Sequence, residues 1–286
     1  MTNAFLQVLR FRIWITFLVV SSLNLELTVA WLAHNLLVAL AWWRTSFAYQ
    51  LCRKISDRIW MLRLPDGRKV LSDFIGLSLI AGIYFEKLYE VYDRFRPRTG
   101  WIVVDVGAHM GFYTLRTAAL VGPSGKVIAV EPDDCNYAIL KRNIERCNLT
   151  NVTAINAALS DRDGVARLVI SDWASTGRVL IQSEAQSDSR SRTRAIRTMR
   201  LDTLMREVGI ETVDLVKIDV EGGEMLVLKG AKECLENTSA MIVVETHGFT
   251  LAQQVAQLLG VHRGFVRIDY VVRTPDVVTP PYVYAS

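Results

Sequence analysis

The stretch from Trp101 to Thr114, W-I-V-V-D-V-G-A-H-M-G-F-Y-T, decides the fold. Its first five residues, Trp101 to Asp105, are mostly apolar and rich in β-branched side chains, which is typical of a parallel strand buried on both faces. Gly107 and Gly111 follow, and a helical pattern runs from Phe112 to Leu120. The stretch therefore predicts a strand, a tight glycine turn and a helix, which together open a nucleotide-binding βαβ unit.

The glycine turn indicates which kind of nucleotide would bind. Glycines let a ligand approach main-chain N–H groups at a helix N-terminus, and a dinucleotide site uses G-x-G-x-x-G to seat a pyrophosphate. Here the order is Asp-x-Gly-Ala-x-x-Gly, which lacks one glycine and places the carboxylate of Asp105 where it would repel a pyrophosphate. That carboxylate suits the ammonium of an amino-acid-bearing cofactor such as S-adenosylmethionine. The alternative is an ordinary strand-to-helix turn whose glycines only relieve strain.

A second unit follows the first. Gly122 to Gly125 form a turn cluster, and Lys126 to Val130 form a second buried strand that ends at Glu131 and Pro132. An acid at the end of the second strand, about 20 residues beyond the glycine turn, is where a ribose diol is usually held. We therefore interpret Glu131 as the ribose ligand.

With these residues the chain resembles the FkbM family of class I S-adenosylmethionine-dependent methyltransferases, from about Arg58 to the C-terminus. Five blocks carry the resemblance, and the fourth is the most specific: V-D-V-G-A-H-M-G-F-Y-T (Val104 to Thr114), V-E-P-D (Val130 to Asp133), N-A-A-L-S-D (Asn156 to Asp161), D-L-V-K-I-D-V-E-G-G-E (Asp214 to Glu224) and V-V-E-T-H (Val243 to His247). Members commonly carry Asn where this chain has His109.

The resemblance implies an α/β fold with a Rossmann-like, seven-stranded, mostly parallel sheet. It implies S-adenosylmethionine as cofactor and O-methylation of a hydroxyl on a sugar, lipid or secondary metabolite. It places the adenine near Asp161. The cofactor-binding residues that we expect are Asp105, Gly107, Ala108, His109, Gly111, Glu131, Pro132, Asp161 and Asp219.

The catalytic candidates follow two later strands. Val213 to Val220 forms a buried strand with Lys217 and Asp219 near its C-terminal end, and the ligand crevice of an open α/β sheet lies outside such ends. Asp219, Glu221 and Glu224 would thus approach the place of methyl transfer. Lys217 needs a carboxylate partner or a substrate oxygen, because an unpaired buried charge costs several kcal/mol.

His247 comes after another predicted strand, Met241 to Glu245, and a histidine there can act as a general base near neutral pH. Asp219, Glu221 or His247 is expected to receive the proton of an alcohol acceptor, so these three and Lys217 are the predicted catalytic residues. We expect no metal, although the carboxylates and His247, together with Glu245, also suit a metal-assisted version.

Residues 13–43 are predicted to associate with a membrane. The run contains no Lys or Arg, carries only Glu26 as a formal charge, and has Trp14, Trp42 and Trp43 near its ends as an aromatic belt would. Three interpretations stay open: one transmembrane or deeply inserted anchor, two shorter interfacial helices or a hairpin, and a soluble helical arm that forms oligomers. The excess of basic residues after Trp43 predicts that the catalytic domain faces the cytoplasm.

The expected organisation is therefore a hydrophobic helical segment at 1–52, a hairpin and helices covering the site at 53–98, and the methyltransferase domain at 99–286. We expect a helix from Tyr84 to Phe95 and a mobile loop from Ser183 to Thr198, whose arginines repel one another.

Composition excludes several other classes. The net charge of +4 over 286 residues is small, and no finger or recognition-helix pattern occurs, so we expect no nucleic-acid partner. The four cysteines form no C-x-x-C pair, which favours reduced structural thiols. A nucleotide-dependent oxidoreductase is disfavoured by the missing glycine, and a non-catalytic membrane scaffold by the intact cofactor motif. The partner that we expect is a small-molecule or lipid acceptor.

Overall fold

The computed structural model describes residues 58–74, 76–170, 177–180, 192–262, 264, 266–269, 272–274, 277–278 and 282–286. The predicted membrane-associating run, 13–43, and the predicted segment 1–52 lie outside these residues. Within the described ranges, none of the helices combines the length and apolar character needed to cross a bilayer.

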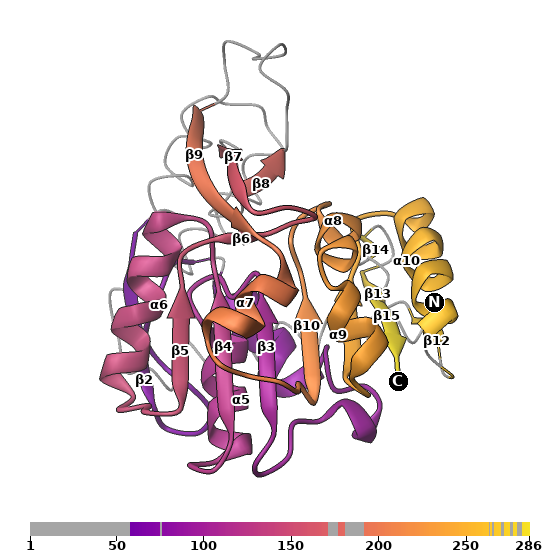
Figure 1. The fold of residues 1–286 in the computed structure, drawn as a ribbon. Helices are drawn as coiled ribbons and strands as arrows, with labels where there is room; N and C mark the ends of the chain where they lie inside the picture. The colour runs from indigo at the N-terminus through magenta and orange to yellow at the C-terminus, as the bar shows by residue number, and fades with distance from the viewer. Residues whose placement is uncertain are drawn as a thin grey trace.

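A seven-stranded sheet forms the centre of the molecule, in the order β12-β15-β11-β10-β3-β4-β5 (Figure 1). β3, β4, β5, β10 and β11 are parallel, and β15 runs antiparallel to both of its neighbours, β11 and β12. This confirms the predicted seven-stranded, mostly parallel sheet. The strands are β3 (Ile102–Val106), β4 (Lys126–Val130), β5 (Val152–Ile155), β10 (Leu215–Ile218), β11 (Met241–Glu245), β12 (Val266–Asp269) and β15 (Tyr282–Ala285).

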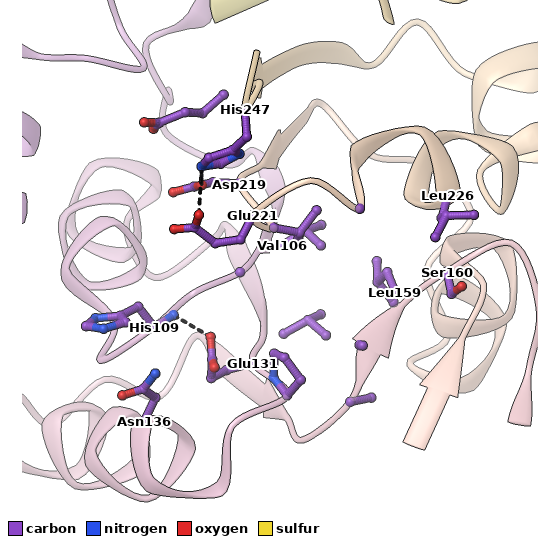
Figure 2. Close-up of a pocket in the computed structure, with 18 of the residues that line it drawn as sticks. Val106, His109, Glu131, Asn136, Leu159, Ser160, Asp219, Glu221, Leu226 and His247 are labelled. Carbon is purple, nitrogen blue, oxygen red and sulfur yellow. Dashed lines mark hydrogen bonds and ion pairs between the residues drawn. The ribbon is translucent and has the colours of Figure 1, made fainter. Parts of the chain in front are cut away.

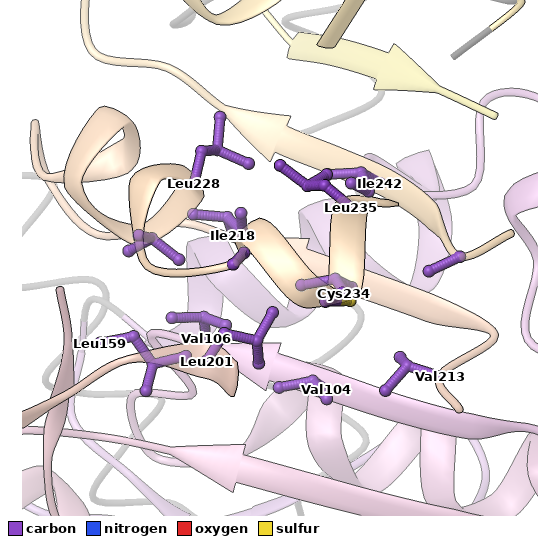
Figure 3. Packing of buried hydrophobic residues seen from close by; sticks show 14 of the residues in the cluster. Val104, Val106, Leu159, Leu201, Val213, Ile218, Leu228, Cys234, Leu235 and Ile242 are labelled. Carbon is purple, nitrogen blue, oxygen red and sulfur yellow. The ribbon is translucent and has the colours of Figure 1, made fainter. Parts of the chain in front are cut away.

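Both faces of this sheet are covered, as the apolar strand sequences predict. Side chains alternate along a strand, so Val103 and Val104 point to opposite faces, and both are fully buried. Figure 3 shows the core on one face, where Val104 and Val106 pack with Ile218 and Leu228. The helices on this side are α7 (Leu201–Glu207), α8 (Glu224–Lys229), α9 (Lys232–Asn237) and α10 (Phe249–His262).

The opposite face is covered by α5 and by the chain that precedes β3. The elements on this side are β1 (Trp60–Arg63), β2 (Lys69–Ser72), α4 (Gly76–Ala81), the π-helical turn η1 (Gly82–Glu86), the 3₁₀ turn η2 (Asp93–Phe95) and α5 (Phe112–Val121). Helix α6 (Asp134–Arg146) lies between β4 and β5 in the sequence, and the side chain of Asp133 caps it by accepting from the N–H groups of Cys135 and Asn136.

The helix expected from Tyr84 to Phe95 is wrong. Only η1 and η2 are helical there, and Lys87 ends η1 in a left-handed conformation with φ 54°. Aromatic packing is the reason, because Tyr92 and Phe95 each meet the ring of Tyr284 on β15 edge-to-face, with ring centroids 5.2 Å and 5.0 Å apart.

The loop expected from Ser183 to Thr198 is also wrong where the structure describes it. Arg192–Met199 form β9, which belongs to a second, four-stranded sheet in the order β6-β9-β7-β8 that projects from one end of the main sheet (Figure 1). Its other strands are β6 (Ala158–Leu159), β7 (Gly164–Ile170) and β8 (Gly177–Leu180); β13 (Val272–Thr274) and β14 (Val277–Val278) form a separate pair. Arg194 and Arg197 do not repel β9 from this sheet because each has a carboxylate partner, Asp134 at 2.8 Å and Glu207 at 2.7 Å.

Candidate active site

A pocket lies where β3, β4, β10 and β11 end, at the carboxyl edge of the parallel strands. Figure 2 shows three groups of side chains around it: His109 with Glu131, then Asp219, Glu221 and His247, and the apolar side chains of Leu159 and Leu226. Parallel sheets bind ligands at this edge. The pocket residues that come from each strand lie at its C-terminal end or in the turn that follows it.

The glycine turn brings two of these strand ends together. A Cβ atom on Gly107 would lie 1.8 Å from the carbonyl oxygen of Asp219, and Gly107 has a φ of 77° that side-chain-bearing residues rarely adopt. The N–H groups of Gly107 and Ala108 both donate to the carbonyl of Val130 at 3.0 Å. Because these N–H groups are used within the fold, the turn does not offer them to a pyrophosphate, which agrees with the exclusion of a dinucleotide site.

Glu131 lies on the pocket wall with its carboxylate held by two main-chain donors. The N–H of His109 donates to Oε2 at 2.8 Å, and the N–H of Asp133 donates to Oε1 at 3.0 Å. Burial raises the pKa of Glu131 to about 7, against the lowering effect of these two hydrogen bonds. Each oxygen retains acceptor capacity, so the side chain can receive further hydrogen bonds from a ligand.

Lys217 and Asp105 form a buried ion pair beneath the pocket. The parallel register pairs their Cα positions on β10 and β3, which puts both side chains on the same face of the sheet. Nζ of Lys217 lies 3.1 Å from Oδ1 of Asp105 and donates to the carbonyl of Gly107 at 2.9 Å. Burial alone would lower the pKa of Lys217, but Asp105 and Asp219 reverse this and raise it. The lysine therefore has a carboxylate partner, which is one of the two kinds of partner that the sequence predicted.

Tyr89, which the sequence did not single out, lines the pocket with its hydroxyl between two carboxylates. Its oxygen lies 2.7 Å from Oε2 of Glu245 and 3.1 Å from Oδ2 of Asp219. Burial, together with these two acids, keeps the pKa of Tyr89 well above its usual value. The phenol thus stays protonated and donates to one carboxylate or the other.

His247 is held between acidic side chains. Nδ1 lies 2.7 Å from Oε1 of the fully buried Glu224, while Nε2 lies 3.1 Å from Oε2 of Glu221 and 4.0 Å from Oδ1 of Asp219. Burial would lower the pKa of His247, but Glu221 and Glu224 outweigh it and raise the pKa to about 11. At neutral pH the ring is therefore an imidazolium that donates from both nitrogens.

Two pocket residues have a backbone conformation that is unfavourable for side-chain-bearing residues. His109 has φ 53° and Glu221 has φ 54°. Such conformations cost about 1–3 kcal/mol each and cluster at functional sites. Here they occur in the two turns that follow β3 and β10.

The structure brings together part of the predicted site. Gly107, His109, Glu131, Pro132, Asp219, Glu221 and His247 line the pocket. Five further predicted residues lie outside its lining: Asp105, Ala108, Gly111, Asp161 and Lys217. Asp105 is fully buried and also accepts a hydrogen bond from Thr114 at 2.6 Å, whereas Asp161 pairs with Arg162 at 3.4 Å. The predicted binding and catalytic roles of all these residues stay predictions.

The family model of the methyltransferase FkbM domain matches residues 105–267, which is more than half of the chain. The chain belongs to the FkbM methyltransferase family. A relative is the 31-O-demethyl-FK506 methyltransferase FkbM of Streptomyces tacrolimicus, 28% identical over 72% of this chain and 89% of that protein. Another is the hexuronic acid methyltransferase AglP of Haloferax volcanii, 27% identical over 62% of this chain and 69% of that protein.

Among solved structures, Aeropyrum pernix fibrillarin with natively bound S-adenosyl-L-methionine aligns with a TM-score of 0.44. It is 14% identical over 80% of this chain and 96% of that chain.

This FkbM-family protein is an S-adenosylmethionine-dependent methyltransferase, and the residues of its pocket fit that cofactor. Glu131 has acceptor capacity left for the ribose hydroxyls, and Leu159 and Leu226 offer an apolar surface for the adenine. The carboxylates of Asp219 and Glu221 suit a positively charged sulfonium. Each of the three groups of side chains in the pocket therefore suits a different part of the cofactor.

Proposed function

We propose that this chain methylates a hydroxyl oxygen of a polyoxygenated acceptor, namely a sugar, a glycolipid or a lipid head group. The observation that carries the proposal is the position of Asp219 and Glu221, two partly exposed carboxylates, in the same pocket as Glu131. A pocket of this kind offers a ribose acceptor at one wall and proton acceptors at another.

S-adenosylmethionine, when bound, supplies a methyl group that is already activated on a sulfonium. The protein has to align the acceptor hydroxyl and take up its proton. Asp219 and Glu221 are the bases in this proposal, because their side chains are 23% and 38% exposed and line the pocket. His247 has no lone pair as an imidazolium, so it acts as a hydrogen-bond donor that fixes Glu221.

Lys217 and Tyr89 position Asp219 in this scheme. Both contact Oδ2 of Asp219, at 3.8 Å and 3.1 Å, so that Oδ1 is the oxygen that faces His247. Fixing the carboxylate of Asp219 in this way favours one orientation of the acceptor hydroxyl. A small displacement of the acceptor from that orientation would lower the rate of methyl transfer by a large factor.

The names of the relatives support oxygen as the methylated atom and a sugar-like acceptor. One is a 31-O-demethyl-FK506 methyltransferase and another a hexuronic acid methyltransferase. The first name specifies an oxygen as the methylated atom, and the second specifies a sugar acid as the acceptor.

A membrane-presented acceptor is part of the proposal and is supported by residues 13–43 alone. That run would hold the catalytic domain at the cytoplasmic face of the bilayer, through an anchor or interfacial helices, and its helices would also be the site of any oligomerisation. The other candidate acceptor is a soluble sugar or secondary metabolite. Deletion of residues 1–52 tests the anchor: the full chain should pellet with lipid vesicles and the truncated chain should not. A truncated chain that still pellets would refute the anchor.

The acceptor itself is tested by measuring S-adenosylhomocysteine release from full-length protein with four acceptors: a hexose, a hexuronic acid, a lipid-linked sugar and a phospholipid. We expect release with at least one oxygen-rich acceptor and loss of release in Asp219→Asn. Glu233→Gln, in an exposed ion pair with Arg206 on α9 and α7, is the control. A product methylated on nitrogen or carbon would contradict the proposal.

A further inference from the structure

We propose that Asp219, Glu221 and His247 bind a divalent cation of the Mg²⁺ or Mn²⁺ type, which holds two adjacent oxygen atoms of the acceptor. The inference rests on the proposed function and names the acceptor more narrowly. Each of the three side chains offers one potential ligand atom, and these atoms lie within 4.8 Å of one another.

The spacing suits an octahedral ion. An ion about 2.1 Å from each ligand has neighbouring ligands about 3 Å apart and opposite ones about 4.2 Å apart. Nε2 of His247 lies 3.1 Å from Oε2 of Glu221 and 4.0 Å from Oδ1 of Asp219. The partly exposed carboxylates have room to draw in, and the ion would replace the proton on Nε2, which leaves to solvent.

The ring of His247 has the kind of supporting hydrogen bond that metal-binding histidines have. A ligating histidine almost always donates its other ring N–H to a carboxylate or carbonyl, which fixes the ring and its tautomer. Nδ1 of His247 lies 2.7 Å from Oε1 of Glu224, and that carboxylate is fully buried on α8. Because Glu224 is fully buried, its hydrogen bond with Nδ1 fixes the ring and directs Nε2 toward Glu221 and Asp219.

The carboxylate of Asp219, the second proposed ligand, is also fixed by neighbouring side chains. Oδ2 of Asp219 is engaged by Tyr89 and Lys217, which leaves Oδ1 on the side of His247. Two of the three ligands therefore have supporting groups that fix the atom they present. These supporting contacts distinguish the cluster from a chance gathering of acidic side chains at the surface.

Charge also favours a cation. The carboxylates of Asp219, Glu221 and Glu224 lie around the ring of His247, and the nearby Lys217 is already paired with Asp105. A divalent ion would offset this excess of negative charge.

Three protein ligands of an octahedral ion leave three positions for water and substrate. Two neighbouring oxygens of one acceptor, as in a vicinal diol or a 2-hydroxy acid, would fill two of them. The ion would orient the hydroxyl and lower its pKa, as divalent ions do for bound water. The other carboxylate oxygen of Glu221 would receive the proton of the hydroxyl, and Asp219 would then serve as a ligand only. A monohydroxyl acceptor could not chelate in this way and would be methylated more slowly.

Manganese binding tests the site, with the electron paramagnetic resonance signal of free Mn²⁺ titrated against full-length protein. We expect one bound ion per chain and its loss in Glu221→Gln and in His247→Gln. Glu224→Leu, which removes the acceptor of the ring Nδ1–H and of the Gly222 N–H, should weaken binding about 10- to 100-fold. Glu236→Gln, an exposed acid on α9, is the control and should bind as wild type does.

S-adenosylhomocysteine binding by the same samples separates the two proposals. Protein that binds the nucleoside but not Mn²⁺, or that binds Mn²⁺ equally well in Glu221→Gln and His247→Gln, would overturn the metal site and leave the methyltransferase assignment intact. Addition of a hexuronate should displace water from the bound Mn²⁺ and lower its proton relaxation enhancement. An unchanged enhancement would overturn chelation of the acceptor.

Discussion

Replacing Lys217 by methionine would remove the cation from a carboxylate that water does not reach. Lys217 is 3% exposed and Asp105 is fully buried, and the two charges lie 3.1 Å apart. Breaking such a pair by removing one partner costs about 3–5 kcal/mol, because the remaining charge stays buried. For a chain of this size that loss lowers Tm by roughly 6 to 20 °C. Urea and thermal unfolding of the full-length chain would measure it.

The double variant Lys217→Met with Asp105→Asn should recover part of this loss. The amide oxygen of asparagine still accepts from Thr114, and no buried charge is left unpaired. Arg206→Met, which breaks an exposed pair with Glu233, should cost only about 0–1 kcal/mol. A loss below about 1 kcal/mol in Lys217→Met, or a double variant as unstable as the single one, would refute the buried pair as a stabilising unit.

Two further variants test the pocket. Gly107→Ala should destabilise the chain and abolish cofactor binding, because the new Cβ would lie 1.8 Å from the carbonyl oxygen of Asp219. Gly209 also has a positive φ, but a Cβ there would meet no atom within 4 Å, so Gly209→Ala is the control and should leave cofactor binding unchanged. Calorimetric titration of both variants with the cofactor measures the difference. Glu131 has a pKa raised from 4.5 to about 7, so its contribution to stability is present below pH 4.5 and lost as pH rises toward 7. Relative to Glu131→Gln, wild type should lose roughly 3 kcal/mol of unfolding free energy over that interval, and a constant difference would contradict the burial of the carboxyl.

The sequence predicted the parts of the fold that local pattern determines. Trp101 to Thr114 and Met241 to Glu245 carry their strand and turn signals within a few residues, and both are found as predicted. A lysine within the apolar run Val213 to Val220 required a carboxylate or a substrate oxygen as partner, and the strand register places Asp105 beside it. Charge and hydropathy within one segment were sufficient for these inferences.

The remainder depends on partners distant in sequence. Tyr89 approaches Asp219 and Glu245 only after the sheet has formed, so no local signal marked it as a pocket residue. The arginines of β9 suggested a loop because their partners, such as Asp134 for Arg194, lie on other elements. In β9, Ile196 and Thr198 are buried on either side of the exposed Arg197, which is the period-two arrangement of a strand.

Cofactor binding is the most direct test of the central claim, that this pocket is the S-adenosylmethionine site of a methyltransferase. The measurement is calorimetric titration of the full-length chain, in detergent, with S-adenosylmethionine and S-adenosylhomocysteine, for wild type, Glu131→Ala and the distant control Glu233→Ala. We predict saturable binding by wild type and the control, and its loss in Glu131→Ala. Absence of binding by wild type, or binding that Glu131→Ala leaves unchanged, would contradict the claim.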